Sequence, residues 1–472
     1  MSTDRTRRSE DGVDLIVRGE QVLLGGALAP ADLVITGGTV AAVVPIGTAS
    51  GRPVLEAEGR VVLPGAVDAH VHANEPGRTH WVGFASLTAA AAAGGVTTVV
   101  DMPIDSNPPT VTVAALRAKR AALRRAGAHT DVALWGGLVP GHLDELDRLL
   151  DAGAVGFKAF LCDSGWADFP ATDAATLRAG CTVAAARDVP VVVHAETDED
   201  RGSVHSEVRA VRWAAQVAAA AGARLHVAHV SAAAAVGEAA RWPHVTVETC
   251  PHCLALDDAD VAAIGPKPAA LTAGRDGANR RRLLELLHAG HITTIASDHS
   301  PCPPAAEAGG RAVVGHRRGA VDVAGAAGRR RAHRDAEPPG HRGRRAAGAG
   351  RQGAIAEGFD ADLALVDPVA SYVLTAGELR QRNPTLSPYV GRRLVGRVHT
   401  TLLRGRGLRS CRLGRCHRAV RGRARRPLTR RLKIGASLRS PHGAHRKQLR
   451  NRNLLERVLP THLPVGMTRW AS

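Results

Sequence analysis

Short apolar runs alternate with segments of helical periodicity or high alanine content between residues 63 and 304. The intervening segments include 112–126, 143–152, 206–221 and 279–289. Regular alternation of strand and helix is typical of an α/β fold, and eight repeats predict a TIM (β/α)8 barrel. The eight apolar runs are residues 67–71, 97–101, 132–135, 155–160, 191–193, 225–230, 245–249 and 293–297.

The segments on either side of residues 63–304 show a different pattern of apolar and turn residues. Residues 1–62 contain short apolar stretches separated by Gly and Pro, and residues 352–403 show the same pattern. Such spacing indicates antiparallel strands joined by tight turns. We therefore expect the N- and C-terminal segments to build a small β-sandwich beside a barrel formed by residues 63–304.

Two segments, 305–351 and 404–472, break the pattern. The first consists mainly of Ala, Gly, Arg and His without a strand or helix period, and the second is arginine-rich with one acidic residue, Glu456. We interpret both as aberrant: the first replaces the last barrel elements, and the second is a tail without a packed structure. Such compositions arise when GC-rich DNA is translated out of frame, and we expect frame-shifts at both places.

The net charge of +18 for 472 residues suggests at first a nucleic-acid partner. The basic excess, however, lies in the two aberrant segments. Trp470 is the only aromatic residue of the tail, so base stacking has little to work with, and we do not expect nucleic-acid binding. The first residues contain no apolar signal region and the cysteines are scattered, which predicts a cytoplasmic protein without a membrane segment.

Side chains that can bind metal ions follow five of the apolar runs. His70 and His72 are two residues apart on one strand, so both side chains point to the same side. A lysine buried after an apolar run is costly unless it is modified or paired. A carbamate formed from CO2 would make it a bridging carboxylate, and the set could then hold two divalent metals. The remaining strand-end residues are Lys158, His194, His229 and Asp298.

The motifs around these residues resemble the cyclic amidohydrolases of the amidohydrolase superfamily, which include dihydroorotases, hydantoinases and allantoinases. The resemblance covers about residues 15–304 and 353–405. It rests on VVLPGAVDAHVHANEPGR, GGVTTVVDMPIDSNPPT, GFKAFLCDSG, VVVHAE, LHVAHVS, VETCPH and SDHSPC.

The resemblance implies metal-assisted hydrolysis of a cyclic amide. His70, His72 and Asp298 would hold one divalent ion and His194 and His229 the other, with carbamylated Lys158 between them. Zinc is the first expectation, and manganese and cobalt are alternatives. Asp298 would accept the proton of the attacking water and deliver it to the leaving nitrogen.

Within the family, the chain most resembles the allantoinases. Dihydroorotases carry an arginine two residues after the second histidine, where it holds a substrate carboxylate, and here that position is Asn74. Allantoin has no carboxylate, so an amide suits it, and the expected reaction opens its ring to give allantoate. Arg275 and Asn279 are further candidate substrate contacts. The resemblance also implies a homo-oligomer, commonly a tetramer.

Two alternatives stay open at this point. One is a hydantoinase, dihydropyrimidinase or dihydroorotase-like activity on a related ring. The other is an inactive product of a damaged gene, since the segments 305–351 and 404–472 interrupt the family pattern.

Overall fold

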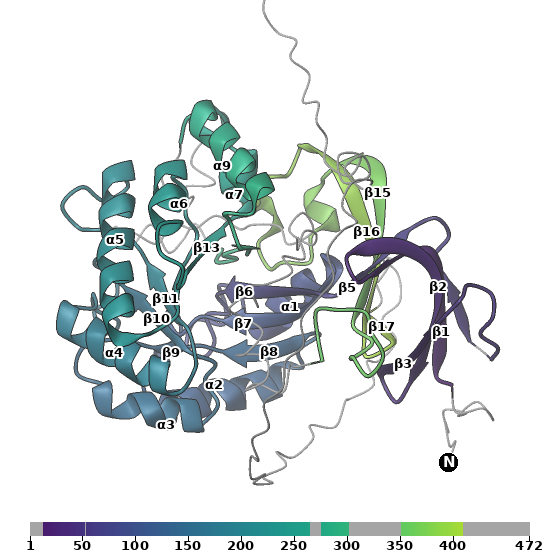
Figure 1. Ribbon diagram of the computed structural model, residues 1–472, viewed down its shortest axis with the longest axis horizontal. Coiled ribbons are helices and arrows are strands. Elements are labelled where there is room, and N and C mark those ends of the chain that lie inside the picture. Colours follow the sequence, from purple (N-terminus) through teal and green to yellow (C-terminus); the bar gives the residue numbers. More distant parts are fainter. Residues whose placement is uncertain (1–12, 52, 265–274, 302–350, 409–472) are drawn as a thin grey trace, which may run out of the picture. The chain divides into compact units, whose positions relative to one another are not determined.

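The computed structural model describes residues 13–51, 53–264, 275–301 and 351–408, which form a mixed α/β structure (Figure 1). The sequence-based interpretation of 305–351 and of the tail therefore falls outside the described residues, apart from Arg351 and residues 404–408. The described part divides into one sheet of largely antiparallel strands and a set of parallel strands with helices between them.

The N- and C-terminal segments join in one eight-stranded sheet, in the order β17-β16-β15-β5-β1-β2-β3 with β4 paired to β1. The two ends of the chain meet where β5 and β15 run antiparallel, with Val62 opposite Leu365. The strands are β1 (Leu15–Leu24), β2 (Ala27–Thr36), β3 (Thr39–Val44), β4 (Val54–Glu56), β5 (Val61–Pro64), β15 (Leu363–Val373), β16 (Arg393–Leu403) and β17 (Arg406–Leu408).

The remaining strands are parallel, and every one of the eight predicted apolar runs overlaps one of them. They form a three-stranded sheet, β6-β7-β8, and a six-stranded sheet, β14-β13-β12-β11-β10-β9. A parallel bridge between Val71 and His299 joins β6 to the segment after β14. The strands are β6 (Ala66–Val71), β7 (Val96–Asp101), β8 (Asp131–Leu134), β9 (Gly136–Gly137), β10 (Phe157–Phe160), β11 (Val191–His194), β12 (Leu225–Val227), β13 (Val245–Thr249) and β14 (Thr294–Ile295).

The helices between these strands begin and end at residues suited to those positions. The side chains of Thr112 and Ser203 accept hydrogen bonds from the first turns of α2 and α5, and Gly127 and Gly222 end these helices in the left-handed conformation. The helices are α1 (Phe84–Ala93), α2 (Val113–Ala126), α3 (Leu146–Asp151), α4 (Ala174–Ala186), α5 (Val204–Ala221), α6 (Ala233–Ala239), α7 (Pro251–Ala255), α8 (Asp258–Ile264) and α9 (Gly277–Ala289).

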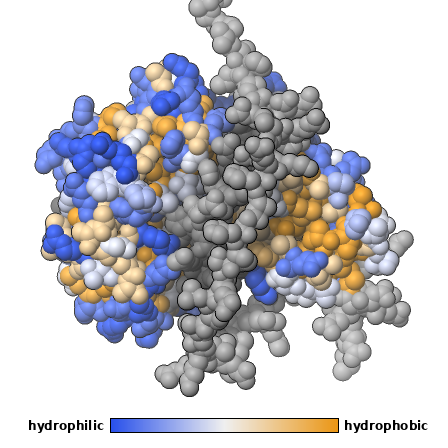
Figure 2. All heavy atoms as spheres, viewed as in Figure 1, coloured by the Kyte–Doolittle hydropathy of each residue, from blue (hydrophilic) through white to orange (hydrophobic). Residues whose placement is uncertain are grey.

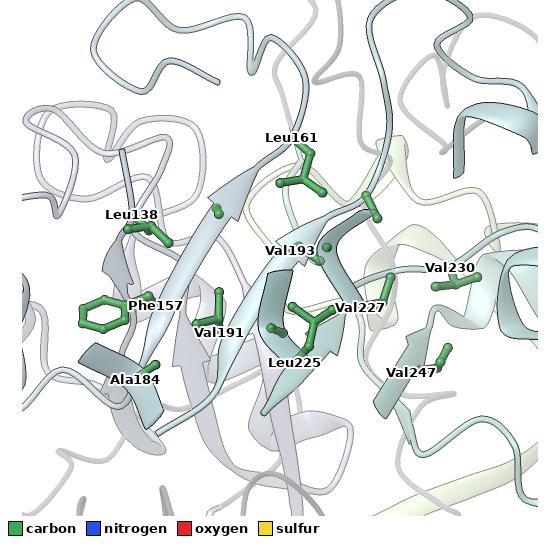
Figure 3. Packing of buried hydrophobic residues seen from close by; sticks show 14 of the residues in the cluster. Leu138, Phe157, Leu161, Ala184, Val191, Val193, Leu225, Val227, Val230 and Val247 are labelled. Atoms are coloured by element: carbon green, nitrogen blue, oxygen red, sulfur yellow. The ribbon is translucent and has the colours of Figure 1, made fainter. Parts of the chain in front are cut away.

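Side chains alternate along the parallel strands, so that one face of the strands packs in the hydrophobic core and the other carries the candidate site. Phe157, Val191 and Leu225 stand opposite one another on β10, β11 and β12 and are buried in the main hydrophobic core (Figure 3). Because successive side chains of a strand point to opposite faces, the neighbouring residues Lys158 and His194 face the other way. The core thus fixes the strands that carry the candidate site.

The end of β16 is tied to helix α1 by a buried hydrogen bond. The Thr401 hydroxyl donates to the Ala92 carbonyl over 2.7 Å, and Thr401 is 3% exposed. Nearby, the Arg404 guanidinium pairs with Asp131 at the start of β8. These contacts hold the eight-stranded sheet against the first helix and strands of the parallel set.

Replacing Thr401 by valine keeps the shape of the side chain and removes the donor. We expect the free energy of unfolding to fall by about 1 kcal/mol, the net worth of one buried hydrogen bond. Thr182→Val is the matched control, since the Thr182 hydroxyl also donates to a carbonyl but lies on an exposed surface of α4. Urea denaturation of both variants measures the difference, and equal losses would contradict a buried role for Thr401.

The view of Figure 2 shows polar residues over the outer helices and apolar ones gathered over the strands of the N-terminal sheet. Within the described ranges, none of the helices combines the length and the apolar character needed to cross a membrane.

Candidate functional site

Two histidines of β6 and its C-terminal end meet an aspartate that follows β14. One carboxylate oxygen of Asp298, Oδ1, lies 3.3 Å from His70 Nε2 and 3.2 Å from His72 Nε2. All three side chains are at most 1% exposed. The hydrogen bond from His72 N to His299 O, 2.9 Å, holds the two strand ends together. The structure thus brings Asp298 to a pair of histidines that lies more than 200 positions earlier in the sequence.

The other candidate residues adjoin this group through the imidazole rings. The rings of His70 and His229 have centroids 5.3 Å apart, and His229 Nε2 lies 3.0 Å from His194 Nδ1. Lys158 is fully buried, and its ammonium group lies 5.2 Å from the centre of the Phe160 ring, which stacks on His194. All six residues expected as metal ligands therefore lie at the same ends of the parallel strands.

Three carboxylates that the sequence analysis did not single out orient these histidines. Glu248 Oε1 lies 2.7 Å from His70 Nδ1, Asp105 Oδ2 lies 2.7 Å from His72 Nδ1, and Glu196 Oε2 lies 2.7 Å from His194 Nε2. A carboxylate on one ring nitrogen fixes the tautomer and leaves the other nitrogen available as a ligand. The only signal for these carboxylates in the sequence is their position, because each of them lies in or beside one of the motifs at the strand ends.

The electrostatic environment keeps His70 neutral and Glu196 ionised. Burial lowers the pKa of His70 to about 4, against the opposing charges of Asp298 and Glu248. Burial alone would raise the pKa of Glu196, but its hydrogen bond to His194 and the charge of that ring lower it to about 2. A neutral imidazole and a carboxylate are the forms that bind cations.

Four non-glycine residues of the site have left-handed backbone conformations. The φ angles are +57° at Asn74, +71° at Asp105, +39° at His229 and +50° at Asp298. Such conformations cost on the order of 1–3 kcal/mol each and persist where the surrounding structure enforces them, often at functional sites. Their concentration here supports a functional role for this end of the strands.

Asn74 lies in a tight loop beside the two histidines of β6. Its side chain is 3% exposed, and within the described part of the chain its Oδ1 atom accepts no hydrogen bond. The loop approaches the segment after β7: a Cβ atom at Gly77, where φ is +91°, would lie 2.6 Å from Asn107 Cβ. A buried amide oxygen without a donor is costly, which fits a group that receives a ligand.

Arg275 and Asn279 lie beside α5 and α6 and already hold backbone groups. Arg275 Nη1 donates to Gly202 O over 2.7 Å. Asn279 donates through Nδ2 to Ser231 O and accepts from Ala233 N, each over 2.8 Å. The Arg275 contact thus holds the segment between β11 and α5, and the Asn279 contacts hold the segment after β12 that follows His229. A direct contact with substrate would require them to exchange these partners.

The donor set fits divalent metal ions. Ligand atoms of His70, His229 and Asp298 all lie within 4.8 Å of one another. Imidazole nitrogens and one carboxylate are the ligands that zinc and similar ions prefer. The buried neutral ring of His70 and the oriented ring of His194 present nitrogens to the same region, so the residues present match the cations that the sequence motifs predict.

Glu248→Gln tests whether the carboxylate behind His70 supports metal binding. The glutamine keeps the size of the side chain but removes the charge that orients the His70 ring, and losses of this kind weaken metal affinity about 10–100-fold. Competition with a metallochromic chelator measures the affinity. Glu145→Gln, on a carboxylate that accepts from Val113 N far from the histidines, is the control. Unchanged affinity in Glu248→Gln would contradict this role.

The chain is similar to known proteins over most of its length. Residues 61–336 match the model of the amidohydrolase family. The allantoinase of Rubrobacter xylanophilus is 41% identical over 429 residues, which cover 83% of this chain and 93% of the relative. The allantoinase of Solibacter usitatus is 39% identical over 427 residues, with the same coverage of both chains.

Solved structures show the same architecture. The L-hydantoinase (dihydropyrimidinase) of Arthrobacter aurescens superposes with a TM-score of 0.73 at 26% identity, covering 84% of this chain and 96% of its own. The D-hydantoinase (dihydropyrimidinase) of Thermus sp. gives a TM-score of 0.72 at 21% identity, covering 83% of this chain and 94% of its own, and shows the fold alone.

Proposed function

This chain belongs to the amidohydrolase family, and on that premise we propose that it hydrolyses the ring amide of allantoin to give allantoate. The observation that carries the proposal is the meeting of four buried imidazoles with Asp298 and Lys158 in a chain 41% identical to an allantoinase. The hydantoinase alternative fits less well, because the hydantoinase structures share 26% identity or less with this chain.

We further propose that the parallel strands form a (β/α)8 barrel. The support is the order of pairing: β6-β7-β8, then β9 to β14, with the bridge from Val71 to His299 returning to β6. Only Trp135 separates the end of β8 from the start of β9, so a nearly continuous strand connects the two sheets. In such barrels the chemistry lies at the C-terminal ends of the strands, where the candidate residues sit.

Two divalent ions, with zinc the first choice, are the proposed cofactors. His70, His72 and Asp298 would hold one ion, His194 and His229 the other, and Lys158 carbamylated by CO2 would bind both. When bound, such ions lower the pKa of water towards neutrality and polarise a carbonyl oxygen.

The residues of the chain then handle the proton and the leaving group. Asp298 takes one proton from the water that attacks the ring carbonyl carbon. It returns this proton to the ring nitrogen as the carbon–nitrogen bond breaks, and the second proton of the water is released to solvent, so a carboxylate and a ureido nitrogen result. Glu248 and Asp105 keep His70 and His72 in the tautomer that the site requires.

Asn74 is proposed to distinguish allantoin from substrates that carry a carboxylate. Its buried side chain offers an amide in place of a cation, so a neutral ring group gains a hydrogen bond while a carboxylate finds no counter-ion. Arg275 and Asn279 complete the proposed substrate contacts; in the structure Arg275 donates to Gly202 O and Asn279 to Ser231 O.

Ring opening of a panel of substrates tests the proposal. We expect kcat/KM for allantoin to exceed that for hydantoin, dihydrouracil and dihydroorotate in the zinc-loaded protein. A higher value for hydantoin or dihydrouracil would assign the chain to the alternative activity. The absence of turnover on all four rings in a folded, metal-loaded protein would favour the inactive product of a damaged gene.

We also propose a cytoplasmic homo-oligomer, with a tetramer as the specific expectation. Three exposed valines on β15 and β16 offer an apolar face: Val369 is 76% exposed, Val395 54% and Val373 46%. Sedimentation velocity should show a species larger than one chain, and Val395→Asp should shift it towards smaller mass. A wild-type protein that sediments as a single chain at micromolar concentration would contradict self-association.

A further inference from the structure

A second group of metal-binding side chains shares one histidine with the site described above. Ligand atoms of Cys162, His194 and Glu196 all lie within 4.8 Å of one another. Cys162 is the second residue after β10 and is fully buried, and Glu196 is the second residue after β11. The group therefore sits beside the same strand ends, and neither Cys162 nor Glu196 belongs to the proposed catalytic ligand set.

The two ring nitrogens of His194 face different neighbours. Nδ1 lies 3.0 Å from His229 Nε2, on the catalytic side, while Nε2 lies 2.7 Å from Glu196 Oε2. The other oxygen of Glu196 accepts a hydrogen bond from Gly202 N over 2.9 Å, which fixes the carboxylate. A neutral imidazole has one lone pair, so His194 can serve one of the two groups at a time.

A small cavity gives access to two members of the group, His194 and Glu196. His194, Glu196 and His229 line it together with Glu207, Val227 and Ser231. The side chain of Glu196 is 19% exposed, whereas those of Cys162 and His194 are buried. A cation entering along Glu196 meets a carboxylate first, then an imidazole and a thiol.

We propose that Cys162, His194 and Glu196 form an inhibitory site for a thiophilic divalent cation, such as Cd2+ or Zn2+ in excess over the catalytic ions. A thiolate, an imidazole and a carboxylate suit soft and borderline cations and disfavour Mg2+ and Mn2+. On binding, the Cys162 thiol releases its proton to solvent, and the ring proton of His194 transfers from Nε2 to Nδ1 through solvent, which frees the Nε2 lone pair for the cation. The ring then offers no lone pair beside His229, so the second catalytic ion loses a ligand.

Cadmium titration of the zinc-loaded full chain tests this site. Cadmium bound to a thiolate gives a charge-transfer absorption in the ultraviolet, and because the chain has seven cysteines, the part of the band lost in Cys162→Ser reports Cys162 without any assay of activity. We expect the band in the wild type and in Cys181→Ala, the control at another buried thiol, on α4. Cys162→Ser should show a weaker band than the wild type and need at least about tenfold more Cd2+ for half-inhibition of allantoin hydrolysis, equivalent to about 1.4 kcal/mol.

A second variant keeps the proposal falsifiable if Cys162→Ser is unstable. Glu196→Gln retains the thiol, so it should keep a band that saturates only at higher Cd2+ concentration. A band of equal strength and affinity in Cys162→Ser would overturn the site, as would saturation of Glu196→Gln at the wild-type concentration. Only the inhibition rests on the proposed function: a cadmium band without allantoin turnover would refute that function and leave the binding site standing.

Discussion

Lys158→Ala is expected to lower kcat/KM for allantoin by at least about a thousandfold. The variant removes the buried nitrogen that would carry the carbamate, and with it the group common to both ions. Metal ions supply several kcal/mol of transition-state stabilisation, and about 4 kcal/mol corresponds to a factor of a thousand. Steady-state kinetics and metal analysis of the same samples measure the effect.

A second variant, Lys158→Arg, distinguishes carbamylation of Lys158 from a need for its positive charge alone. Lys158→Arg keeps the charge and cannot form the carbamate, so it should be as inactive as Lys158→Ala. A short carboxylic acid such as acetate or propionate should restore part of the activity of Lys158→Ala by filling the space with a carboxylate, and should not help Lys158→Arg. Activity in Lys158→Arg close to that of the wild type would contradict the carbamate.

Asp298→Asn is expected to lower kcat by about 10²–10⁴-fold, the usual contribution of a positioned acid or base. The amide has nearly the same shape but cannot accept a proton from water. Asp163→Asn, at an exposed carboxylate that accepts from Gly165 N in the loop after β10, should leave kcat unchanged. Equal activity of Asp298→Asn and wild type at equal metal content would remove Asp298 from the proposed proton transfer.

The parallel strands could be predicted from the sequence because their physical signal is local. Residues 191–193 and 245–249 are apolar runs bounded by turns, and both are strands in the structure. Helix α4 lies between the runs 155–160 and 191–193, where the alternation predicts a helix without giving its bounds. Its stability comes from packing, with Leu177 and Cys181 in the main core.

The positions of the candidate ligands could also be predicted, because parallel strands bring their C-terminal ends to one edge. The carboxylates that contact the ring nitrogens of these histidines could not be predicted. Glu248 reaches His70 across 178 positions of sequence, and only the pairing of the strands places it there. Similarly, Asp and His adopt left-handed conformations more often than most residues, but only the surrounding structure enforces them at His229 and Asp298.

The proposed substrate contacts were the hardest to predict. Asn74 lies two residues after His72 in the sequence and is buried, so its position followed from proximity. Arg275 and Asn279 were chosen by resemblance of a motif, and the structure shows both bonded to the backbone around Gly202 and Ser231. Whether a polar side chain contacts a ligand or a neighbouring loop depends on tertiary packing, which a short motif does not encode.

Reconstitution of the metal-free protein tests the central claim most directly. Chelated protein should be inactive towards allantoin, and activity should return with zinc in the presence of bicarbonate, rising until two equivalents per chain are bound. Manganese or cobalt in place of zinc would change the rate and leave the stoichiometry at two. Full allantoin turnover in protein shown by elemental analysis to hold no metal would contradict the account, and so would maximal activity with one ion bound per chain.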